Sequence, residues 1–131
     1  MKVKVSELSD PALDWAVSKA EGHYLFLEVD GKWRCEIGDN GPHDIGTSGK
    51  YGYSPSTDWS QGGPLIDEYD PEERRLPELD RYAEIWLDRS GGSEGVGRGV
   101  GKTRLIAFCR ALVNAKLSDE IEIPDELLAT A

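Results

Sequence analysis

Residues 53–66, YSPSTDWSQGGPLI, are the part of this sequence whose residue types best suit ligand binding. Aromatic faces can stack on a planar ring, hydroxyl and carboxylate groups can bind sugar hydroxyls, and glycine N–H groups can approach an anion closely. Tyr53 and Trp59 are expected to stack on the ligand, and Asp58 and the hydroxyls to orient it. The predicted ligand-binding residues are Tyr53, Ser54, Ser56, Thr57, Asp58, Trp59, Gln61, Gly62 and Gly63.

The same residue types also have local structural uses, so the sequence leaves two interpretations open. Ser54, Ser56 and Asp58 can accept hydrogen bonds from nearby backbone amides, as such residues do in turns. Gly62 and Gly63 permit a positive φ. A structural loop and a ligand pocket would therefore contain the same residue types.

A second motif, GVGRGVGKT at residues 95–103, ends like a phosphate-binding P-loop. The P-loop pattern requires its first glycine at the position that Val96 occupies, so the match is incomplete. A glycine-rich loop that leads into a helix can still bind an anion through free N–H groups. Lys102, Thr103 and Arg104 are the candidate anion-binding residues, and a flexible linker is the alternative interpretation.

No arrangement of residues indicates catalysis or metal binding. The sequence has no Gly-x-Ser-x-Gly elbow, and neither histidine lies in a motif with a nucleophile. Cys35 and His43 lack the short paired spacing of a zinc site. We therefore predict no catalytic residue, no metal and no cofactor, and we expect Cys35 and Cys109 to be reduced and buried.

The charge is strongly acidic, with 25 acidic against 15 basic residues and a net charge of −10. Such a surface disfavours direct binding to nucleic acid. Residues 67–88 hold nine acids and three arginines, and could mimic nucleic acid toward a basic partner or form a solvated surface loop. The sequence shows no targeting signal and no membrane span, so we expect a cytoplasmic protein.

Two helices are predicted from caps and apolar periodicity. Ser9 and Pro11 start the first, an apolar stripe follows, and Gly22 is placed to end it. The second spans residues 103–117, with Thr103 as its cap. Its expected inner stripe comprises Leu105, Ile106, Cys109, Leu112, Val113 and Lys116.

Alternating residues predict the strands. Asp30-Gly31 indicates a two-residue hairpin turn, which would place Phe26 opposite Cys35. Residues 121–123 can form a short strand that pairs with a strand at residues 2–5.

The remaining segments are expected to be loops or short elements. Residues 38–63 read as a long loop, residues 81–88 as a strand or helical turn, and residues 90–101 as a mobile glycine-rich loop. The predicted fold is a single α+β domain of all 131 residues, with two main helices packed on a small antiparallel sheet and long loops. Residues 67–101 would be a variable insertion, acidic first and then glycine-rich.

Three blocks of the sequence resemble the phage NinX-like family of proteins of unknown function. They are MKVKVSELSDPALDWAVSKAEG at the start, YSPSTDWSQGGPLI in the middle and TRLIAFCRALVNAKLSDEIEIPDEL near the end. The resemblance implies a phage or prophage accessory protein that is expressed in a bacterial host, and it supplies no catalytic residues. Phage accessory proteins of this size often counter host defences, which is an analogy between gene types.

The expected function is that of a non-enzymatic binding protein of phage origin. Its partner would be a small molecule, a nucleotide among them, or a host protein, and a homodimer is compatible with either. One alternative is an acidic nucleic-acid mimic that inhibits a host protein. Another is a small hydrolase or transferase that uses residues 53–66.

Overall fold

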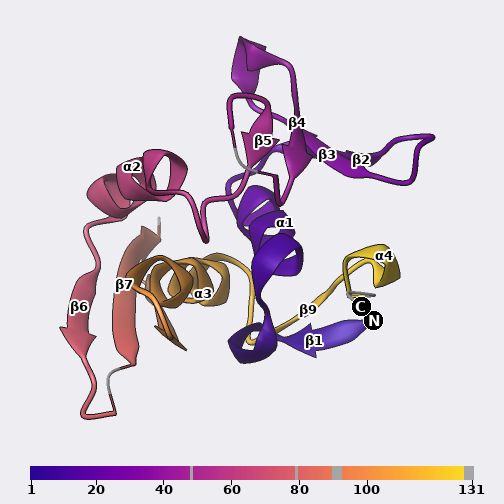
Figure 1. Ribbon diagram of the computed structural model, residues 1–131. Helices are drawn as coiled ribbons and strands as arrows, with labels where there is room; N and C mark the ends of the chain where they lie inside the picture. The colour runs from indigo at the N-terminus through magenta and orange to yellow at the C-terminus, as the bar shows by residue number, and fades with distance from the viewer. Residues whose placement is uncertain (48, 79, 90–92, 129–131) are drawn as a thin grey trace.

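The computed structural model describes residues 1–47, 49–78, 80–89 and 93–128, which form an α+β fold (Figure 1). Four helices are found among these residues: α1 (Asp10–Ala20), α2 (Trp59–Tyr69), α3 (Arg104–Lys116) and α4 (Asp125–Leu128). The described strands divide among three small sheets. The expected α+β class is confirmed, but its finer form, two main helices on one sheet, is corrected because α2 is a third long helix and the strands do not join into one sheet.

One sheet joins the two ends of the described chain, and the other two sheets lie between them in the sequence. The first pairs β1 (Lys2–Lys4) with β9 (Glu120–Glu122). The second has the order β2-β3-β4-β5, with strands at Tyr24–Leu27, Trp33–Glu36, Pro42–Ile45 and Gly52–Tyr53. The third has the order β6-β7-β8, with strands at Glu72–Arg75, Arg81–Arg89 and Ser93–Gly101. Two 3-10 turns, Val5–Glu7 and Gly38–Asn40, complete the described elements.

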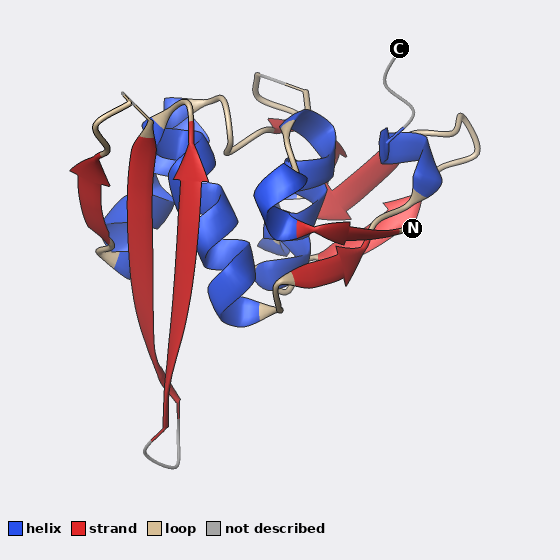
Figure 2. Cartoon of the chain, turned by 90° about the horizontal axis from the view of Figure 1, so that it is seen from below, coloured by secondary structure: helices blue, strands red, loops and turns tan. Residues whose placement is uncertain are grey.

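Helix α3 forms the centre of the core and packs against α1 and against one face of the β7–β8 hairpin (Figure 2). Thr103 caps it as predicted, because its side chain accepts a hydrogen bond from the Ile106 N–H at 3.1 Å. The predicted single stripe is too narrow, since Phe108 is fully buried while Lys116 is exposed. Because α3 lies between α1 and the β7–β8 hairpin, it buries residues on two sides, and a single amphipathic stripe covers only one of them.

The glycine-rich run is a strand, β8, and not the loop expected over residues 90–101. Residues 90–92 of that expected loop lie outside the described residues. Gly97, Gly99 and Gly101 recur at every second position, so all three face α3. A Cβ atom at Gly99 would lie 2.2 Å from the carbonyl oxygen of Ala107 in α3. The glycines therefore allow the strand to lie directly on the helix backbone.

The predicted pairing of the two ends of the chain is confirmed. β1 and β9 are antiparallel, with Val3 opposite Ile121. α1 and the positive φ of Gly22 are confirmed as well. Ser9 is the N-cap residue by position, but its side chain makes no capping hydrogen bond.

The hairpin of β2 and β3 forms, but its register differs from the prediction by one residue. Leu25, not Phe26, lies opposite Cys35. The cause is the turn: Glu28 N–H donates to Lys32 O at 2.9 Å, so three residues with Gly31 at φ +83° make the connection. Such a turn is a common alternative to the two-residue one. Because side chains alternate along a strand, the one-residue shift moves Phe26 from the core face to the outer face.

Residues 38–63, expected to form a long loop, contain β4, β5 and the first turn of α2. Gly62 and Gly63 are in the helix and lack the positive φ that we expected of them. Asp58 caps the helix by accepting a hydrogen bond from Ser60 N–H at 2.9 Å. Tertiary packing of Ile66 outweighs the poor helix propensity of the Gly-Gly-Pro sequence.

The two neighbouring glycines of α2 are expected to differ in how strongly alanine destabilises the protein. A Cβ at Gly62 would lie 2.4 Å from Pro55 O and 2.5 Å from Leu105 Cδ2, whereas at Gly63 its nearest neighbour beyond the adjacent residues is Trp59 Cε3 at 3.6 Å. We expect Gly63→Ala to change the free energy of unfolding by about 1 kcal/mol or less, because the gain in helix propensity is opposed by contact of the new Cβ with the ring of Pro64. We expect Gly62→Ala to lower it by about 1–3 kcal/mol through overpacking. Urea unfolding of both variants measures the difference, and equal effects would contradict the packing of α2.

Candidate functional site

The predicted ligand-binding segment is divided between the core and the surface. Tyr53, Ser54, Ser56 and Gly62 are buried. Tyr53 is 6% exposed and packs edge-on against His23, with ring centres 5.3 Å apart. Burial raises the pKa of the Tyr53 hydroxyl. In this structure Tyr53 therefore has no open face on which a planar ligand could stack.

Ser56 connects this segment to α1 through a buried hydrogen bond. Its backbone N–H donates to Asp14 Oδ1 at 2.9 Å. Asp14 is 1% exposed, and burial raises its pKa to about 6, although the hydrogen bond from Ser56 acts in the opposite direction. The side-chain hydroxyls of Ser54 and Ser56 are buried without a hydrogen-bond partner among the described residues. Ser54, Ser56 and Asp14 are therefore part of the protein interior and not of an open binding surface.

Gln61 also has a structural role. Its Oε1 atom accepts a hydrogen bond from Ser54 N–H, and its Nε2 donates to Gly52 O, both at 2.6 Å. Both backbone partners lie in or next to β5. Gln61 therefore joins the first turn of α2 to the second sheet.

The surface part of the segment begins at Thr57 and Asp58 and includes Trp59. Gly63, the last residue of the predicted set, is half-buried beside Trp59 in α2. Trp59 is 51% exposed, and the guanidinium carbon of Arg104 lies 5.2 Å from its ring centre. Such a contact is a cation–π interaction. The structure thus brings together one residue from the predicted ligand-binding set and one from the predicted anion-binding set.

Arg104 also lines a hollow of 270 Å³ between β6, β7 and the start of α3. We call it the arginine hollow, and its described lining is Glu73, Arg74, Arg81, Tyr82 and Arg104. Arg104 Nη2 lies 2.7 Å from Glu73 Oε2, and its Nε donates to both carboxylate oxygens of Glu73. The guanidinium of Arg74 lies 4.6 Å from the ring centre of Tyr82.

The hollow is positively charged in an otherwise acidic protein. Three guanidinium groups and one carboxylate give its lining a formal charge of +2. Hydrogen bonding to Glu73 raises the pKa of Arg104. Within the described part of the chain, no ion pair joins Arg74 or Arg81 to a carboxylate. Arg81 lies on the α3 face of the sheet with Glu73, whereas Arg74 lies on the other face over Tyr82. Arg81 is therefore free to bind an anion beside Arg104.

The other two predicted anion-binding residues, Lys102 and Thr103, make contacts outside the arginine hollow. The side chain of Thr103 caps α3. Lys102 Nζ lies 3.7 Å from Asp80 Oδ1, and the lysine side chain is largely exposed. Sequence reasoning missed Arg74, Arg81 and Tyr82 because their proximity arises from the β6–β7 pairing, for which no motif gave a signal.

The acidic segment at residues 67–88 is not a uniform acidic surface. Glu73 pairs with Arg104, Asp80 with Lys102, and Glu84 with Arg98 at 3.0 Å. Hydrogen bonds from Tyr82 and Arg98 lower the pKa of Glu84. The segment itself spans the end of α2, β6 and most of β7. Mimicry of a nucleic-acid backbone would need a row of unpaired carboxylates. Glu73, Asp80 and Glu84 do not supply one, because each is paired with a basic side chain.

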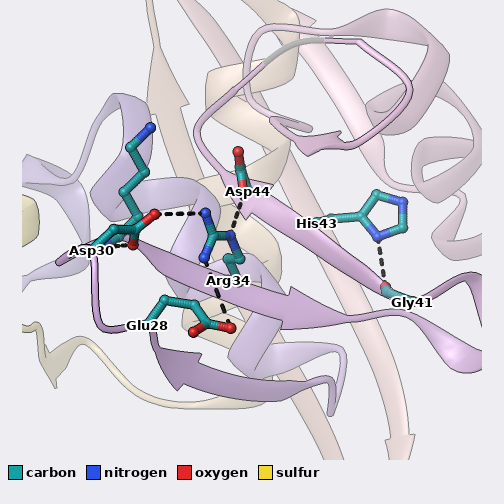
Figure 3. Close-up of polar contacts among 7 residues, drawn as sticks. Glu28, Asp30, Arg34, Gly41, His43 and Asp44 are labelled. Atoms are coloured by element: carbon teal, nitrogen blue, oxygen red, sulfur yellow. Dashed lines mark hydrogen bonds and ion pairs between the residues drawn. The ribbon is translucent and has the colours of Figure 1, made fainter.

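A second arginine cluster, on the β2–β3–β4 sheet, has the opposite charge balance (Figure 3). Arg34 Nε lies 2.6 Å from Asp44 Oδ1, its Nη2 lies 2.9 Å from Asp30, and its Nη1 lies 3.8 Å from Glu28. Three carboxylates around one guanidinium neutralise it, so it offers no anion site. This cluster ties the hairpin turn to β4.

Comparison with known proteins identifies one family. The family model described as "Bacteriophage P22, NinX" matches residues 4–116, which is most of the chain. No curated protein matches the chain. Among the described helices, none has the length and apolar character to cross a membrane.

Proposed function

Because the chain belongs to the NinX family of phage proteins, we propose that it is a phage accessory protein that binds a small phosphorylated ligand, such as a nucleotide, in the arginine hollow. One observation carries the proposal: Arg81, which has no carboxylate partner among the described residues, lines a hollow beside Arg104, which Glu73 holds in place. In the bacterial host, a protein of this kind would sequester its ligand and so counter a host defence.

Arg81 is the proposed phosphate-binding residue. A guanidinium group can donate two parallel hydrogen bonds to a phosphate, and these are among the strongest hydrogen bonds in proteins. Arg81 lies opposite Gly101 and therefore on the face of the sheet that packs on α3, where Glu73 holds Arg104. Arg74 lies over the ring of Tyr82 on the opposite face and is not part of the proposed site.

Arg104 and Trp59 complete the proposed site at its other side. Glu73 orients Arg104 through a two-point contact. The half-exposed ring of Trp59 next to Arg104 offers a surface on which a planar base could stack. This retains Trp59 as a ligand-binding residue and assigns the buried residues of the predicted set to support of the fold.

The size and chemistry of the hollow favour binding over catalysis. A volume of 270 Å³ lies just below the usual range of about 300–1,000 Å³ for small-molecule sites. Part of a nucleotide would therefore remain exposed. The carboxylate of Glu73 is paired with Arg104, and Asp58, a carboxylate of the segment that the hydrolase alternative would use, caps α2. Neither is placed to act as a general base in the hollow.

Calorimetric titration with inorganic phosphate, AMP and ADP tests the proposal. We expect Arg81→Ala to weaken binding about tenfold or more, since a hydrogen bond to a charged group contributes about 1.5–3 kcal/mol. Arg74→Ala is the matched control, because it removes the same charge from the neighbouring strand at a side chain that lies on the opposite face of the sheet. Binding should also weaken at high salt.

Two results would contradict the proposed function. The first is a wild-type protein that binds none of the three anions. The second is an equal loss of affinity in Arg74→Ala and Arg81→Ala, because this would indicate general charge attraction and not a defined site.

A further inference from the structure

Two of the sheet edges in this protein carry ordinary protection against pairing with another strand. The edge strand β6 has the sequence EERR, and all four residues are exposed. At the edge strand β8, Arg98 N–H donates to Asn114 Oδ1 at 3.0 Å, and Val100 O accepts from Arg110 Nη1 at 2.7 Å. Charged residues and covered backbone groups are the common means by which proteins block an open edge.

The edge strand β2 lacks both kinds of protection within its described residues. Its sequence, YLFL, contains no charged residue. Because Glu28 N–H bonds to Lys32 O, and hydrogen-bonded pairs alternate along an antiparallel ladder, Tyr24 and Phe26 direct their backbone groups toward β3. The backbone N–H and C=O groups of Leu25 and Leu27 therefore face outward, at an edge with which no described strand pairs.

The side chains of this edge are also unusually apolar for a surface. Tyr24 is 66% exposed and Leu27 is 46% exposed. Tyr24 and Phe26 stack on each other on the outer face, with ring centres 5.6 Å apart. An exposed edge strand of this kind is a template for pairing with another strand.

We propose that β2 pairs antiparallel with β2 of a second copy of this chain, which joins two four-stranded sheets into one. A two-fold axis perpendicular to the sheet keeps each face continuous across the interface, because it reverses the strand without turning it over. Leu25 and Leu27 of both copies then share the inner face, and Tyr24 and Phe26 share the outer face.

The absence of charge on β2 permits a second copy to approach at this edge. Two copies of a protein with a net charge of −10 repel each other over most of their surfaces. The residues of β2 carry no charge, so close approach at this edge places no like charges directly opposite one another within the strand. The outward N–H and C=O groups of one copy meet the same groups of the other, which makes the edge complementary to itself.

Sedimentation velocity on the full chain, over a range of protein concentrations, tests the dimer. We expect the wild type to reach twice its monomer mass of 14.5 kDa. Leu25→Pro should yield a monomer, because proline removes an N–H that faces outward and leaves the hydrogen bonds to β3 intact. Leu27→Lys, which places a charge on the edge, should do the same and is the second variant if Leu25→Pro fails to fold.

Val100→Lys is the matched control, since it adds the same charge to an edge whose backbone groups are already bonded, and it should remain dimeric. A monomeric wild type would overturn the proposal. So would a dimer that persists in Leu27→Lys with an unchanged circular dichroism spectrum. The arginine hollow lies in a different sheet, so loss of the dimer and loss of ligand binding can be told apart.

Discussion

Replacing Gly99 with alanine is expected to lower the free energy of unfolding by about 3 kcal/mol or more. The added Cβ would lie 2.2 Å from Ala107 O and 2.5 Å from Ala111 N. Both atoms belong to the backbone of α3 and cannot rotate away. The β7–β8 hairpin would have to separate from the central helix.

Urea unfolding followed by far-ultraviolet circular dichroism measures this effect. Val100→Ala is the control, because Val100 is adjacent in β8 but faces away from α3 and is 41% exposed. We expect its cost to be about 1 kcal/mol or less, as for most surface substitutions. If Gly99→Ala were no more destabilising than this control, the close contact between β8 and α3 would be wrong.

Replacing Asp14 with asparagine is expected to remove a pH dependence of stability. Burial raises the pKa of Asp14 from 3.8 to about 6 in the folded protein. Between these two values the folded chain binds a proton that the unfolded chain has released, so stability from this group falls as the pH rises. The contribution of this group to the free energy of unfolding is therefore about 3 kcal/mol larger well below pH 4 than at pH 7.

Asparagine keeps an oxygen that can accept the hydrogen bond from Ser56 N–H, and it carries no charge to desolvate. We therefore expect Asp14→Asn to exceed the wild type in stability by a larger margin at pH 7 than at pH 4. The two margins should differ by about 2 kcal/mol, less than the full difference because pH 4 still lies above the unfolded pKa of 3.8. Asp67→Asn, an exposed change of the same charge, should show little of this effect. A difference between variant and wild type that is constant with pH would contradict the buried, neutralised carboxyl group.

Part of the candidate site could be anticipated from the sequence. Trp59 and Arg104 were each predicted to bind a ligand, for separate reasons. Their contact could not be predicted, because 45 residues separate them and only the packing of α2 against α3 brings them together. Arg74 and Arg81 gave no signal, since a pair of arginines seven residues apart has no meaning until β6 and β7 pair.

The sequence by itself determined what short-range physics controls. Local capping, helical periodicity and alternation sufficed to predict α1, α3 with its Thr103 cap, and the pairing of β1 with β9. The two buried, free cysteines were also predicted correctly. These features depend on the order of neighbouring residues or on the burial of apolar positions. Both can be recognised in the sequence without knowledge of the tertiary structure.

Only the tertiary structure decided the features that depend on a surface supplied by another part of the chain. The glycines of β8 look like a flexible loop until α3 lies against them and makes their missing side chains a requirement. The Gly-Gly-Pro of α2 looks like a turn until Pro55 and Leu105 fill the space beside Gly62. In each case the local preference is about 1 kcal/mol per residue, and the packing that opposes it amounts to several.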